Sequence, residues 1–140
     1  MKNRNTIINL IILPHHIVGV FYFILYLFIM EELTVQMMMV DEWKQNILSS
    51  LNGIIFNMIK RQYPFVNGIV DINVDRVSPI LSVVEMTITF SVEKYPSHKE
   101  HLKLDKDVKT MIEMLQLQKI EVSENHKWNL KLSIQLVENN

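Results

Sequence analysis

Three acidic residues are the first candidates for chemistry in this chain. Asp71, Asp75 and Glu85 lie in segments that alternate apolar and polar residues, at positions predicted to face solvent. Carboxylates gathered on one sheet face can bind a divalent cation. Asp71 and Asp75 are too far apart to share one ion, because four residues of strand span roughly 13 Å. Asp71 is expected to meet Glu85 across a hairpin, where two carboxylates repel each other. The favoured interpretation is a solvated strand face without a metal.

Histidines form the second group of candidates. His98, Glu100 and His101 occur in the segment "SHKEH", and a three-residue spacing can place two histidines on one side of a turn. No other ligand motif accompanies them, and neighbouring lysines would repel a cation. His126 is interpreted in the same way. We therefore expect solvated loops here, and neither a metal nor a cofactor.

Catalytic and nucleic-acid motifs are absent from the sequence. The chain has no cysteine, no G-x-S-x-G nucleophile elbow and no glycine-rich phosphate loop. Its 14 basic and 15 acidic residues give a net charge of −1, whereas proteins that bind phosphate backbones carry a basic excess. The outward residues predicted for residues 85–93 include no aromatic side chain on which a base could stack. The sequence thus predicts neither an enzyme nor a nucleic-acid-binding protein.

The regular elements begin after residue 30. Residues 33–39 alternate and predict a strand with Leu33 and Met37 on its apolar face. Asp41 is a suitable N-cap for a helix that buries Trp43 and Ile47 and ends at the Tyr63-Pro64 pair, residues 63–64.

Strict alternation then predicts a hairpin from residues 66–74 and 84–92. The inward side chains fall on even numbers in both strands, so the loop must hold an odd number of residues or a strand must carry a bulge. A second helix is predicted over residues 105–118, a short strand at the "KIEV" segment and a last strand over residues 128–136.

This order predicts an α+β fold, specifically a ferredoxin-like βαββαβ two-layer sandwich formed by a single domain over residues 31–140. Both helices would cover one sheet face and leave the other polar. If the first strand is wrong, the same segment becomes a long helix followed by a hairpin, a helix and a strand.

Residues 1–30 form a separate hydrophobic segment. Residues 6–30 carry no full charge when histidine is neutral, and as a helix they span roughly 37 Å, enough for a bilayer. Lysine and arginine precede this run and Glu31 and Glu32 follow it, which places the N-terminus in the cytoplasm by the positive-inside tendency.

A second interpretation of this segment stays open. Asn9, Pro14 and two histidines interrupt the run, and residues 17–30 alone are short for a span. The chain has no alanine and is rich in isoleucine, asparagine and lysine, which indicates an AT-rich gene. Untranslated AT-rich sequence also reads as hydrophobic residues, so Met30 is the alternative first residue of the protein.

For function, we expect a non-enzymatic protein-binding or assembly module, such as a small phage or viral structural component. The alternative is a membrane-anchored accessory domain with a single transmembrane segment at residues 6–30. The protein would be membrane-anchored in that case and otherwise soluble or virion-associated. The expected partner is another protein or a second copy, and the face predicted to bind it consists of Thr87, Thr89, Ser91, Lys131, Ser133 and Gln135.

Overall fold

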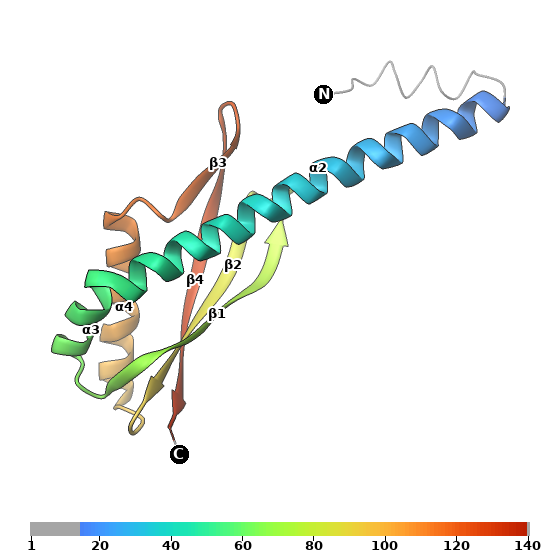
Figure 1. Ribbon diagram of the computed structural model, residues 1–140. Coiled ribbons are helices and arrows are strands. Elements are labelled where there is room, and N and C mark those ends of the chain that lie inside the picture. The colour runs from blue at the N-terminus through green and yellow to red at the C-terminus, as the bar shows by residue number, and fades with distance from the viewer. Residues whose placement is uncertain (1–14, 140) are drawn as a thin grey trace. The chain divides into compact units, whose positions relative to one another are not determined.

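A computed structural model describes residues 15–139 and confirms the α+β class (Figure 1). Its elements are α2 (His15–Ser50), η1 (Leu51–Ile55), α3 (Phe56–Gln62), β1 (Val66–Ser78), β2 (Val83–Val92), α4 (His98–Met114), β3 (Lys119–Ser123) and β4 (His126–Glu138). The chain divides into two compact units between Met38 and Met39, inside α2, and each unit is described by itself.

The strand predicted over residues 33–39 is wrong, because this segment is part of α2. Its leucine, glutamine and methionines are good helix formers, and extending an existing helix needs no new nucleation. The Thr34 hydroxyl donates to the Met30 carbonyl 2.8 Å away, one helical turn earlier. Asp41 is accordingly an exposed residue inside the helix rather than its N-cap. The alternative interpretation, a long helix followed by a hairpin, a helix and a strand, describes this region correctly.

The four strands form one mixed sheet in the order β1-β2-β4-β3. β1 and β2 are antiparallel, β2 and β4 are parallel, and β3 and β4 are antiparallel. The "KIEV" strand is confirmed as part of β3. The observed order is therefore helix, two strands, helix, two strands, which differs from the predicted βαββαβ order.

Strand β1 reaches the expected register through bulges. Val74 pairs with Met86 and Ile72 with Ile88, so even positions do face even positions. The loop of residues 79–82 is even in length, and the register shift between Val74 and Arg76 supplies the expected bulge. A further shift between Ile69 and Asp71 leaves Val70 59% exposed, although its even number predicted an inward side chain. Repeated bulges also make this edge strand a poor template for pairing with another chain.

The core of the second unit lies between one sheet face and the helices. Residues 39–50 of α2, together with α3 and α4, supply buried side chains that pack against the alternate residues of β2 and β4. Gly53 has non-helical backbone angles and marks a kink between α2 and α3. The largest fully buried side chains are Trp43, Trp128, Phe90, Ile47, Leu51, Ile59, Ile72, Met86, Ile88, Leu104, Ile112 and Val40.

Helix α4 begins seven residues before the predicted start, at His98 instead of residue 105. Ser97 and Glu100 form a reciprocal capping box, in which the Glu100 amide donates to the Ser97 hydroxyl 3.2 Å away and the Ser97 amide donates to the Glu100 carboxylate 3.3 Å away. These bonds satisfy amide groups that a helix start leaves without partners. The segment "SHKEH" is therefore the first turn of a helix and not a loop. The helix also ends earlier than predicted, at Met114 instead of residue 118. Leu104 is therefore a buried helix residue, whereas Leu115 lies just beyond the helix and is 45% exposed.

Candidate functional site

The open face of the sheet brings the predicted partner-binding residues together. β2 and β4 are adjacent and pair without a register shift, so Thr87 lies beside Ser133 and Thr89 beside Gln135. The alternate residues of both strands are buried on the opposite face. The β2 members are half-buried and the β4 members are exposed, so the face consists of the two rows Thr87, Thr89, Ser91 and Lys131, Ser133, Gln135.

Strand β1 adds acceptors and donors beside these rows. The carboxylate of Asp75, the bulged residue, accepts from the Thr87 hydroxyl at 2.5 Å and from the Asn73 amide at 2.7 Å. Both Asp75 oxygens therefore have partners, and Thr87 is held in place. The hydroxyl of Ser91 donates more weakly to the Gly68 carbonyl at 3.4 Å. Thr89 lies between these two fixed hydroxyls at the middle of the β2 row, and Gln135 lies beside it on β4.

Opposite charges offset each other at one end of the face. The Glu85 carboxylate lies 3.9 Å from the Arg76 guanidinium and 3.6 Å from the Lys131 ammonium. All three side chains are partly exposed, so these pairs contribute little to stability. With Ser78, Leu81 and Val83 they border a shallow hollow. The face therefore has hydrogen-bonding capacity with little net charge.

The expected approach of Asp71 to Glu85 is wrong. Asp71 pairs with Thr89, and its carboxylate accepts from the backbone amide of Ile72 at 2.7 Å, while Arg76 is the residue opposite Glu85. The short loop of residues 79–82 pairs Ser78 with Val83, so Glu85 lies near the loop and Asp71 lies several residues further along the hairpin. Within residues 15–139, no group of three or more histidine, aspartate or glutamate side chains is arranged to hold a metal ion.

The histidines make individual hydrogen bonds. A ring nitrogen of His101 lies 3.3 Å from the Ile134 carbonyl and links α4 to β4. The Trp128 indole donates to His126 Nε2 at 3.1 Å, and the Ser82 hydroxyl lies 3.4 Å from the same nitrogen. His98 is the exposed first residue of α4. These contacts tie neighbouring elements together.

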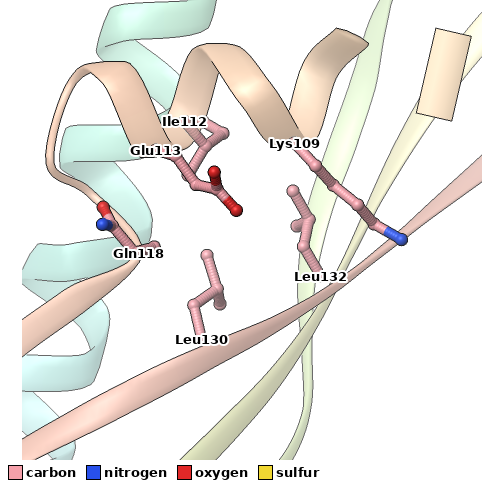
Figure 2. A pocket seen from close by; sticks show the side chains of 6 residues that line it. All are labelled: Lys109, Ile112, Glu113, Gln118, Leu130 and Leu132. Carbon is pink, nitrogen blue, oxygen red and sulfur yellow. The ribbon is translucent and has the colours of Figure 1, made fainter. Parts of the chain in front are cut away.

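A small pocket between α4 and β4 has a volume of about 100 Å³ (Figure 2). It is lined by Lys109, Ile112, Glu113, Gln118, Leu130 and Leu132. Lys109 is paired with Asp105 at 2.9 Å. The buried Gln118 Oε1 has no hydrogen-bond partner among the described residues, and a donor would stabilise it. The pocket is large enough for a few water molecules but smaller than the roughly 300–1,000 Å³ typical of ligand pockets.

A contact between a tyrosine and an aspartate was not predicted from the sequence. The Tyr63 hydroxyl donates to the Asp107 carboxylate and links the end of α3 to α4. Burial raises the pKa of the Tyr63 phenol well above its usual range, and the hydrogen bond and negative charge of Asp107 raise this pKa further. The phenol is therefore neutral at physiological pH. Nothing in the local sequence pattern predicts a contact between residues 44 positions apart.

The N-terminal part of α2 exposes apolar side chains. Ten large hydrophobic residues between Val20 and Met30 are each 41–62% exposed. By length and composition this helix is capable of crossing a membrane, and none of its most apolar stretch of 18 residues is buried. Such a surface is unlike that of a core helix, which is covered by the rest of the protein.

The comparisons with known proteins identify no relative. The sequence matches no protein-family model and no curated protein, and no solved structure matches the fold.

Proposed function

We propose that this chain is a non-enzymatic binding or assembly module held at a membrane by the N-terminal part of α2. The proposal rests on the exposure of large apolar side chains on all sides of the helix from Val20 to Met30. Exposed apolar surface costs about 25 cal/mol per Å² in water, and a bilayer removes that cost. A helix also satisfies its own backbone hydrogen bonds, as a span in hydrocarbon requires.

The charges on either side of the apolar run support one orientation. Lys2 and Arg4 precede residues 6–30, and Glu31 and Glu32 follow them. The positive-inside tendency then leaves the N-terminus in the cytoplasm and the α+β domain on the other side. That Met30 is the first residue of the protein stays a prediction. The strand expected just after Met30 supported that prediction, but this segment belongs to α2, which continues through Met30.

We also infer that the α+β domain is a circular permutation of the ferredoxin-like fold. Placing β4 ahead of the helix formed by α2 and α3 gives the order βαββαβ. The parallel pair β2–β4 at the centre of the sheet, with β1 and β3 at its edges, supports this relation. The fold alone does not specify a function, so the binding proposal depends on the open face.

The anchor is tested by introducing charges into it. In the full-length chain, Ile24→Arg combined with Leu27→Arg is expected to abolish flotation with membranes after a carbonate wash. Each arginine at the centre of a span costs about 2.5–3.5 kcal/mol. The matched control is Leu102→Arg with Met114→Arg, which adds the same charges at side chains that are 56% and 77% exposed. Release of the unaltered chain by carbonate would refute the anchor.

The open face is tested with a threonine pair. Thr89→Lys introduces a charge at the middle of the face and is expected to reduce partner recovery from native membranes at least tenfold, or about 1.4 kcal/mol. Thr110→Lys on the exposed side of α4 is the control with the same change in charge. Recovery is measured by quantitative mass spectrometry after cross-linking. Equal recovery with both variants would contradict a role for this face.

A further inference from the structure

The exposed apolar surface of α2 continues past the predicted span. Beyond Glu31 and Glu32, Leu33 is 43% exposed and Met37 is 55% exposed, and Val35 and Met38 are exposed as well. Two adjacent carboxylates mark the end of the hydrocarbon layer, because a charge inside it costs several kcal/mol. Lipid therefore does not account for the covering of these side chains. This step rests on the membrane anchor proposed above.

One apolar seam runs through this boundary without interruption. Phe23, Tyr26, Met30, Leu33 and Met37 follow the alternating three- and four-residue spacing of a coiled-coil seam. A seam through Val35 and Met38 is interrupted, because the seam positions one helical turn before and after this pair are the charged Glu31 and Glu42. The seam ends at Met37, because the next position, Val40, is already buried in the core of the second unit.

From this spacing we propose that a second copy of the chain packs in parallel against this seam, which we call the α2 seam (Phe23, Tyr26, Met30, Leu33 and Met37). Copies anchored in one membrane share the same orientation, so the seam of one faces the seam of the other in register.

The charges of α2 are compatible with this partner. In the heptad that places Met30 and Met37 at a and Leu33 at d, Glu31 and Glu32 take the outer positions b and c. The positions beside the seam between Leu33 and Met37 are the uncharged Thr34 and Gln36. Two identical helices therefore meet without opposing like charges, and leucine at d is the residue that favours parallel dimers.

Disulfide scanning tests the proposal directly, because the full chain contains no cysteine. Single substitutions Leu33→Cys, Val35→Cys, Met37→Cys and Met38→Cys are made in the full-length protein and oxidised in native membranes. Leu33→Cys and Met37→Cys are expected to form at least five times more disulfide dimer than Val35→Cys and Met38→Cys, since a disulfide needs Cβ atoms about 3.5–4.5 Å apart. All four positions are exposed in the single chain, so none of the changes opens a cavity within its own fold.

Three outcomes would overturn the α2 seam: equal cross-linking at all four positions, a maximum at Val35 and Met38, or the absence of dimer at every position. Flotation of the same variants separates the two proposals. Variants that float but fail to cross-link at residues 33 and 37 refute the seam alone, whereas variants that do not float refute the anchor and the seam together. As a second measurement, Leu33→Glu with Met37→Glu is expected to halve the protein mass measured by light scattering in mild detergent, and an unchanged mass would contradict the seam.

Discussion

Replacing Trp43 by alanine is expected to lower the free energy of unfolding of the α+β domain by about 3–5 kcal/mol. The side chain is only 1% exposed, at the point where the C-terminal part of α2 packs in the core. Its indole also donates to the Leu117 carbonyl at 2.6 Å, just after α4. The substitution therefore leaves a cavity and removes a hydrogen bond between two distant segments of the chain.

Trp43→Phe separates these two effects. Phenylalanine keeps most of the apolar contact but cannot donate to Leu117, so a smaller loss of about 1–3 kcal/mol is expected. Unfolding by urea is followed by circular dichroism for all variants, and by fluorescence for the two substitutions, in which Trp128 is the remaining tryptophan. A loss below about 1 kcal/mol for Trp43→Ala would show that α2 does not pack through this residue.

The alternation of β2 was sufficient to predict its strand and the direction of its side chains. Met86, Ile88 and Phe90 are buried, and Thr87 and Thr89 lie on the other face, as the alternation of even- and odd-numbered positions predicts. The same rule placed the β4 residues on the open face, because neither strand is bulged where the two pair. Local sequence patterns do not predict the parallel pairing of β2 with β4, because this pairing depends on contacts between segments distant in the sequence.

The rule that alternate residues face opposite sides of a strand gave a wrong prediction where another physical effect was stronger. Val70 is exposed because a bulge in β1 reverses the side-chain direction beside it. Residues 33–39 satisfy the period of a strand, but their helix propensity and the helix before them determine the structure. In both cases the order of apolar residues along the chain is compatible with more than one backbone geometry.

The start of α4 is predictable from its capping residues, which carry no apolar period. Serine at position 97 and glutamate at position 100 form the S-x-x-E capping box, and apolar residues at the helix period follow it. Glu100, a candidate metal ligand by sequence, instead completes the cap of this helix. The consequence for packing is that Leu104, which precedes the predicted helix start at residue 105, is a fully buried helix residue.

Two leucines on this first part of α4 give a test of its position. Leu104→Ala is expected to lower the free energy of unfolding by about 2–5 kcal/mol, because the leucine is 0% exposed and its removal leaves a cavity. Leu102→Ala changes the same atoms at a site that is 56% exposed, and is expected to alter stability by no more than about 0.5 kcal/mol. Both values are measured by urea denaturation of the full-length chain in detergent micelles. If residues 98–104 were instead a solvated loop, both substitutions would have the same small effect, and equal losses would therefore contradict the early start of α4.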